Sequence, residues 1–178
     1  MKKKLTVSLA VLALVACMAA GATLAWLTAK TSSVTNTFTY GDINIELKET
    51  TGESYKMVPG NKITKDPKVT VKANSEACWL FVKVEKSGNF DSFMEYRIAS
   101  GWTKLDGVDG VYYREVASPT DDTVFDVLSG NSVTVKDSVT KEDFAGLKGT
   151  MPTLTFTAYA CQKDNVTTAT QAWNLINE

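Results

Sequence analysis

Histidine, on which many catalytic sites depend, is absent from this sequence of 178 residues. Its absence excludes the HExxH zinc helix, the Ser-His-Asp triad and the Cys-His pair. Aspartate and glutamate are plentiful, but no two of them are marked out by apolar surroundings as an acid-base pair. The glycines occur singly at turn positions, so the sequence contains no phosphate-binding loop. We therefore predict a protein that is not an enzyme, with no catalytic residues and no cofactor.

Cysteine could supply metal ligands or a disulfide. Of the three cysteines, Cys17 lies in an apolar N-terminal run, while Cys78 and Cys161 each lie in a strand-like run. Two thiolates without histidine cannot form a zinc site unless carboxylates contribute, and no CxxC spacing is present, so we predict no metal ligands. Cys78 and Cys161 either form a disulfide across neighbouring strands or remain two buried free thiols.

Two other groups of residues could bind a ligand. The stretch 106–110 carries two aspartates, but calcium prefers six or more oxygen ligands, so this sequence is typical of a turn. Exposed aromatic side chains at Trp102, Tyr112 and Tyr113 could recognise a glycan or a surface polymer. The alternative is that these three rings pair across strands in an ordinary core.

The N-terminus is typical of an export signal. Lys2, Lys3 and Lys4 precede an uncharged run over residues 5–29, which ends in small residues. A basic segment followed by an apolar segment and small residues is the pattern that a signal peptidase recognises. We predict a signal peptide over residues 1–25, with Thr23 and Ala25 before the cut and Trp26 as the first residue of the exported chain.

Two alternatives compete with cleavage after Ala25. The uncharged run is long enough to span a bilayer as an uncleaved anchor, for which about 20 residues suffice. Residues 14–17 also have the form of a lipoprotein box, in which Cys17 would be acylated. The residues after Cys17 remain apolar instead of forming a polar tether, which favours cleavage after Ala25.

Cleavage would also change the formal net charge of the protein. Loss of Lys2, Lys3 and Lys4 takes it from -1 to -4, which gives no reason to expect nucleic acid as a partner.

The exported chain alternates apolar and polar residues with the period of a half-buried β-strand. This alternation predicts strands around residues 37–40, 43–48, 68–72, 78–84, 133–135 and 154–161. In the run 78–84, we expect Leu80, Val82 and Val84 to face inward and Trp79 and Phe81 to be covered by another element. In the run 154–161, even-numbered and odd-numbered residues should form opposite faces.

Turns and two short helices separate or follow these strands. Pro59-Gly60 and Asp66-Pro67 indicate turns, and residues 102–105 and 111–114 should form a hairpin. Thr168 and Gln171 resemble a capping box before an amphipathic helix that should pack Trp173 onto the body. Thr140 indicates the start of one more turn of helix. The pattern predicts an all-β protein, a β-sandwich of jelly-roll or immunoglobulin-like kind with a short C-terminal α-helix, preceded by a signal peptide helix.

Several blocks of sequence resemble the TasA/camelysin family, which Gram-positive bacteria export through a SipW-type signal peptidase. In chain order these blocks are GATLAWLT at 21–28, TNTFTYGDINI at 35–45, PGNKITKDP at 59–67, WLFVKV at 79–84, and TAYACQ at 157–162 with Ala172-Trp173. The resemblance covers the signal, the first third of the exported domain and its end. It implies a secreted, jelly-roll-like sandwich and a SipW-type signal peptidase as a partner.

TasA-like members polymerise into biofilm matrix fibres, in which an N-terminal extension of one subunit completes a sheet of the next. Residues 26–34, which begin with Trp26 and Leu27, are the candidate for such a donor strand, and an N-terminal tail without this role is the alternative. Camelysin is described as a zinc metallopeptidase, but this chain offers no imidazole, so we do not transfer that activity.

We accordingly expect a signal peptide over 1–25, an N-terminal extension and first strand over 26–40, and a β-sandwich domain over 41–178. The first functional hypothesis is a secreted structural or interaction protein of the cell surface or biofilm matrix that associates with itself or with other surface proteins. A monomeric glycan-binding module is the second hypothesis, and a metallopeptidase is the third. We expect contact with the membrane only through the signal segment.

Overall fold

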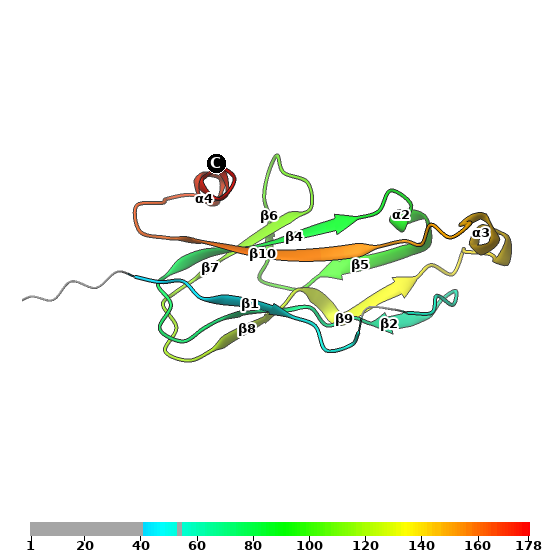
Figure 1. Ribbon diagram of the computed structural model, residues 1–178, viewed down its shortest axis with the longest axis horizontal. Coiled ribbons are helices and arrows are strands. Elements are labelled where there is room, and N and C mark those ends of the chain that lie inside the picture. The colour runs from blue at the N-terminus through cyan, green and yellow to red at the C-terminus, as the bar shows by residue number, and fades with distance from the viewer. Residues whose placement is uncertain (1–40, 53–54) are drawn as a thin grey trace, which may run out of the picture. The chain divides into compact units, whose positions relative to one another are not determined.

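The computed structural model describes residues 41–52 and 55–178 (Figure 1). The chain divides into a unit of residues 1–38 and a unit of residues 39–178, and the described residues belong to the second. The predicted cleavage site at Thr23, Ala25 and Trp26, the donor-strand candidate at Trp26 and Leu27, and the strand predicted at 37–40 lie outside the described residues. No helix among the described residues is long and apolar enough to cross a membrane.

The described chain forms three antiparallel sheets, which confirms an all-β, sandwich-like fold. The first sheet contains, in order, β1 (Ile45–Lys48), β3 (Lys68–Val71) and β8 (Thr123–Asp126). The second contains β10 (Leu154–Gln162), β4 (Cys78–Lys86), β7 (Val111–Val116) and β6 (Thr103–Lys104). The third contains β2 (Lys62–Thr64), β9 (Leu128–Val135) and β5 (Met94–Ile98).

The first and third sheets run into one another along the chain. Only residues 65–67 separate β2 from β3, and only Val127 separates β8 from β9. The Val127 amide donates a hydrogen bond to the Pro67 carbonyl, so the two connections are themselves paired. These two short sheets therefore lie end to end opposite the longer strands β4 and β10 (Figure 1).

β4 lies at the centre of the molecule, as its sequence predicts. Leu80 and Val82 are fully buried against Val69 and Val71 of β3 in the cluster between the sheets. Trp79 and Phe81 point to the opposite face, where α4 (Ala169–Ile176) covers them. The Trp79 indole N–H donates to the Val166 carbonyl at 2.9 Å, so this buried polar group is satisfied. β4 is thus apolar on both faces because each face has its own cover.

The hairpin and the helices predicted from sequence are present. β6 and β7 form the hairpin, and Gly110 must lack a side chain, because a Cβ there would lie 2.3 Å from the Val84 carbonyl oxygen. Thr140 caps α3 (Lys141–Gly146) in a full capping box with Asp143. A shorter helix, α2 (Phe90–Phe93), which the sequence did not predict, precedes β5.

The cap of α4 differs in detail from the predicted capping box. The Thr168 hydroxyl accepts from the Gln171 amide, as the pattern requires. The Gln171 side chain, however, accepts from the amide of Thr167, one residue before the cap. Both contacts satisfy amides at or just before the first turn, so the helix begins where the sequence indicates. Its Trp173 is 8% exposed and lies against the Phe81 ring, at 5.3 Å between centroids.

Of the two alternatives for Cys78 and Cys161, the disulfide is not formed, and both residues are free thiols. Cys161 is paired with Trp79, not with Cys78, whose partner in β10 is Gln162. Neighbouring residues of a strand point to opposite faces, so Cys78 lies in the cluster between the sheets and Cys161 lies under α4. The alternative of two buried free thiols is therefore met by Cys78, which is buried, while Cys161 is free but only half-buried.

Candidate functional site

The aromatic residues considered for glycan recognition do not form a common surface. Tyr112 packs into the cluster between the sheets, and its neighbour Tyr113 packs on the opposite face beneath α4. Trp102 lies over the Arg114 guanidinium at 5.3 Å and donates its indole N–H to the Asp126 carbonyl. All three side chains are partly buried, so they belong to the packing and form no exposed aromatic platform.

The acidic stretch at 106–110 forms the hairpin turn between β6 and β7. Gly107 and Gly110 both have positive φ values there, and Asp109 lies 3.8 Å from the Lys104 ammonium. Within residues 41–52 and 55–178 no three histidine, cysteine or acidic side chains gather where they could hold a metal ion.

The feature that stands out is the outer edge of β10. This strand ends the four-stranded sheet on one side, and no described strand pairs with its outer edge. Hydrogen bonds from Ser87 to Thr153 and from Lys163 to Ala77 flank its ladder with β4. Because hydrogen-bonded pairs alternate along an antiparallel ladder, the odd-numbered residues of β10 direct their backbone groups toward β4.

The even-numbered residues of β10 therefore direct their amide and carbonyl groups toward the open edge. These residues are Leu154, Phe156, Ala158, Ala160 and Gln162. Their side chains face the other sheets, since Phe156, Ala158 and Ala160 pack against the central cluster. The edge thus offers backbone donors and acceptors in register with an inward-facing apolar row.

That inward row is less buried than the neighbouring row on β4. Leu80 and Val82 are fully buried, whereas Ala160 and Ala158, which lie opposite them on β10, are only half-buried. The difference follows from position among the described strands, where β4 is paired on both sides and β10 is paired on one side only. A further strand beside β10 would complete the burial of this row.

The other edge strands carry the protection that β10 lacks. Each has at most five residues and at least one charged side chain: Glu46 and Lys48 on β1, Lys62 on β2, Glu95 and Arg97 on β5, Lys104 on β6 and Asp126 on β8. β10 has nine residues without a charge or a proline. Short length and charge are the usual devices that keep an edge strand from pairing with another chain. β10 therefore has the properties of an edge that accepts a strand.

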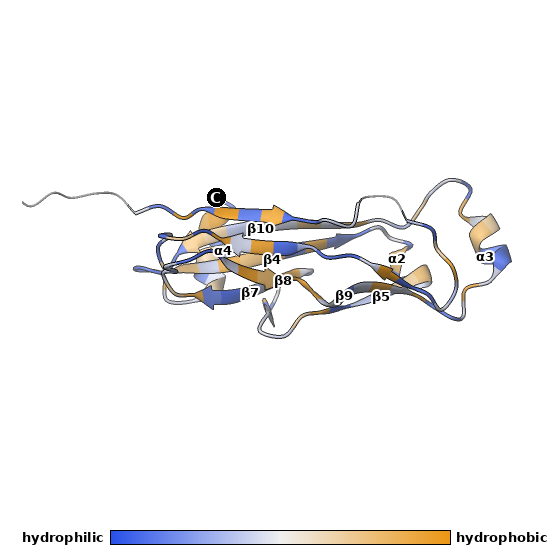
Figure 2. Ribbon diagram, turned by 90° about the horizontal axis from the view of Figure 1, so that it is seen from below, coloured by the Kyte–Doolittle hydropathy of each residue, from blue (hydrophilic) through white to orange (hydrophobic). Residues whose placement is uncertain are grey.

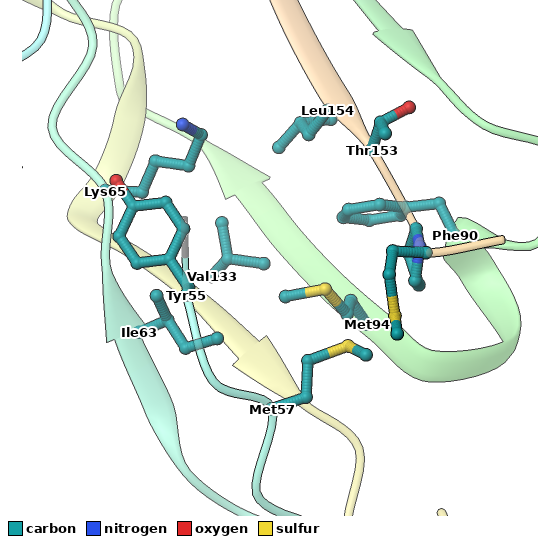
Figure 3. A pocket seen from close by; sticks show the side chains of 11 residues that line it. Tyr55, Met57, Ile63, Lys65, Phe90, Met94, Val133, Thr153 and Leu154 are labelled. Carbon is teal, nitrogen blue, oxygen red and sulfur yellow. The ribbon is translucent and has the colours of Figure 1, made fainter. Parts of the chain in front are cut away.

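A pocket adjoins the start of this edge, between β10 and the sheet of β2, β9 and β5 (Figure 3). Its volume is about 390 Å³. The side chains that line it are mostly apolar and come from several separate segments: Tyr55, Met57, Ile63, Lys65, Phe90, Met94, Val133, Met151, Pro152, Thr153 and Leu154. We call this space the methionine pocket, because Met57, Met94 and Met151 all contribute to it.

The one charged group in the lining is already paired. The Lys65 ammonium donates to both carboxylate oxygens of Glu49 at 2.8 Å, and its side chain is only 13% exposed. It also lies 5.3 Å from the Tyr55 ring centroid and 5.8 Å from that of Phe156. The pocket therefore presents no free charge from Lys65 and suits an uncharged occupant.

The sequence predicts β10 as a strand but does not predict it as a site. Its unbroken uncharged run was the available signal, because every other edge strand carries a charge. The methionine pocket had no such signal, since its segments are far apart in the chain.

The chain was compared with protein families, with curated proteins and with solved structures. No family model, no curated protein and no solved structure matches it.

Proposed function

We propose that this protein is a secreted structural or interaction protein of a bacterial cell surface or biofilm matrix, which assembles when a strand from another copy pairs with the open edge of β10. The single observation that carries this proposal is the edge itself, with nine residues, no charge and five outward-facing pairs of backbone groups. Strand addition uses main-chain hydrogen bonds for affinity and side-chain pockets for specificity.

The export signal and the family resemblance supply the rest of the proposal. The basic and apolar N-terminus fits export and removal by a SipW-type signal peptidase. The sandwich-like arrangement fits the jelly-roll-like domain that the TasA/camelysin resemblance implies. Residues 26–34 are the strand that one copy offers to the next, and assembly of this kind requires no cofactor and no catalytic group.

Proline in place of Ala158 tests the proposal. The amide of Ala158 points to the open edge, so the substitution removes a donor that an added strand needs and leaves the hydrogen bonds to β4 in place. We expect residues 26–178 to form filaments with rising concentration in electron microscopy, and the Ala158→Pro chain to remain monomeric.

Val124→Pro is the matched control. The Val127–Pro67 hydrogen bond and the register of β8 with β3 place the Val124 amide at the open edge of β8. This chain should assemble as the unsubstituted one does. Filaments from the Ala158→Pro chain, or an unsubstituted chain that stays monomeric at high concentration, would rule out assembly through β10.

A further inference from the structure

The methionine pocket lies where the side chain of an added strand would enter. Leu154 is the first residue of β10, its side chain lines the pocket, and its backbone groups point to the open edge. Residues that lie directly opposite one another in a sheet point to the same face. The residue of an added strand opposite Leu154 therefore directs its side chain into the pocket.

The composition of the pocket selects an apolar occupant. All the methionines of residues 26–178 line it, and methionine is the apolar side chain that best adapts its shape to a partner. Met94 is only 9% exposed, whereas Met151 is 56% exposed. A volume of about 390 Å³ admits one large aliphatic or aromatic side chain. An unfilled apolar pocket of this kind gains stability when a side chain enters it.

The donor-strand candidate has one face that fits this pocket. Residues 26–34 are nine in number, as are those of β10. On an extended strand, Leu27, Ala29, Thr31 and Ser33 share one face, and Trp26 and Lys30 share the other. If Trp26 faced inward, Lys30 would face inward too and place an ammonium group beside the half-buried Ala158, without a partner. The Leu27 face is therefore the inward one.

The position of the pocket then sets the direction of the added strand. A parallel strand places Leu27 at the Leu154 end of β10, beside the methionine pocket. An antiparallel strand places Leu27 at the Gln162 end, on the far side of Ala158 and Ala160. Val34 would reach that end on an antiparallel strand, but it shares the outward face with Lys30. Only the parallel arrangement therefore fills the pocket with a large aliphatic side chain of the inward face.

We propose that the methionine pocket of one copy receives the Leu27 side chain of another, in a strand that runs parallel to β10. This inference rests on the proposed function, and it adds which residue is the anchor, which pocket holds it and which way the strand runs.

Disulfide trapping in residues 26–178 tests the inference. Cys78→Ala and Cys161→Ala remove the natural thiols, and Leu27→Cys is then combined with Met151→Cys, whose exposed position tolerates the change. Under mild oxidation we expect a ladder of covalent oligomers in a denaturing gel without reductant. Trp26→Cys with Met151→Cys should give at most a faint ladder, because the Trp26 side chain points to the other face.

The outcomes separate this inference from the proposed function. A ladder from Leu27→Cys with Gln162→Cys, and none with Met151→Cys, would overturn the parallel register and the pocket while strand addition to β10 stands. If neither pair gives a ladder and the unsubstituted chain stays monomeric, both proposals fail.

Truncation of the anchor provides a measurement that needs no introduced cysteine. Leu27→Ala should raise the concentration at which filaments appear by at least about tenfold, the effect expected when a large side chain no longer fills an apolar pocket. Trp26→Ala should leave that concentration within about twofold of the unsubstituted chain. Equal effects of the two substitutions would show that Leu27 is not the anchor.

Discussion

At the scale of single residues, the pairing register decides the chemistry of the two cysteines. Cys161 lies opposite Trp79, which is the residue after Cys78 in β4, so the two thiols point to opposite faces of the sheet. Burial raises the pKa of the Cys78 thiol to about 11, with a smaller contribution from Cys161, so Cys78 stays protonated at neutral pH. Burial raises the pKa of the Cys161 thiol as well. Both thiols are therefore poor nucleophiles in the folded protein.

We expect alkylation to distinguish these thiols from a disulfide. In the folded chain without reductant, iodoacetamide at neutral pH should leave Cys78 unmodified and modify Cys161 slowly. After unfolding in guanidinium, still without reductant, mass spectrometry should find both residues modified. A chain that takes up no label after unfolding would contain the disulfide that the register excludes.

Asp66 shows how a single carboxylate fixes a loop near the pocket. Its side chain accepts hydrogen bonds from the Thr50 hydroxyl at 2.6 Å and from the Thr50 amide at 2.9 Å. These hydrogen bonds, the one from the hydroxyl first, hold the pKa of Asp66 at about 2, below its ordinary 3.8. They connect the segment after β1 to the segment between β2 and β3.

The lowered pKa makes stability depend on pH in a defined direction. The unfolded chain binds a proton at Asp66 more readily than the folded chain, so the stabilisation is complete above pH 3.8 and is lost as the pH falls to about 2. Asp66→Asn should therefore flatten the acid limb of the stability curve in this window. Urea unfolding between pH 2 and pH 6 measures this, and an unchanged slope in the variant would show that Asp66 makes no contribution.

At the scale of elements, α4 has a role that its length does not suggest. The helix has only eight residues, yet Ala169, Ala172 and Trp173 cover the second face of β4. The Trp173 ring lies 5.3 Å from the centroids of both Phe81 and Tyr159. Without this helix, the apolar side chains on the outer face of the four-stranded sheet would be exposed. Figure 2 shows how apolar and polar residues alternate along the strands.

The N-cap of α4 should therefore matter to the stability of the whole unit. Thr168→Ala removes the hydroxyl that accepts from the Gln171 amide and should lower the free energy of unfolding by about 1 kcal/mol. Thr170→Ala, at an exposed position inside the helix, serves as the control and should change it by less than about 0.5 kcal/mol. Chemical denaturation measures both, and an equal effect of the two substitutions would show that the cap contributes nothing.

The pattern of neighbouring residues in the sequence predicts many of the strands and helices correctly. Alternation assigned the faces of β3, β4 and β10 correctly, and the threonine caps marked the starts of α3 and α4. Periodicity depends only on neighbours in the chain, and those faces are set by such neighbours. It could not show that β10 is an edge or that Cys161 lies opposite Trp79, because both depend on which distant strand pairs with β10 and in which register.

The methionine pocket could not be predicted from neighbouring residues either, because its lining comes from segments that are distant in the sequence. Met57, Met94 and Met151 come from a loop, a strand and another loop, and they meet only after the sheets pack. The separation of the aromatic residues considered for glycan recognition, in contrast, could be read from local pattern, because alternation alone places Tyr112 and Tyr113 on different faces. The free thiols follow from register, which no single segment specifies.

At the scale of the whole molecule, the edge strands of the sheets differ in length and in charge. The edges formed by β1, β2, β5, β6 and β8 are short and charged, and that of β10 is long and uncharged. A sandwich protected at every edge but one directs association to that edge and to one direction of growth. This asymmetry suits a subunit that adds to a neighbour in a defined way, which is the central claim of the proposed function.

Hydrogen exchange of the β10 amides tests this claim most directly. In the dilute monomer, the amides of Thr157 and Tyr159, which donate to β4, should exchange slowly, and those of Phe156, Ala158 and Ala160 should exchange fast. In the assembled protein, the second set should become protected to the level of the first. Fast exchange at Phe156, Ala158 and Ala160 in filaments would contradict strand addition at β10.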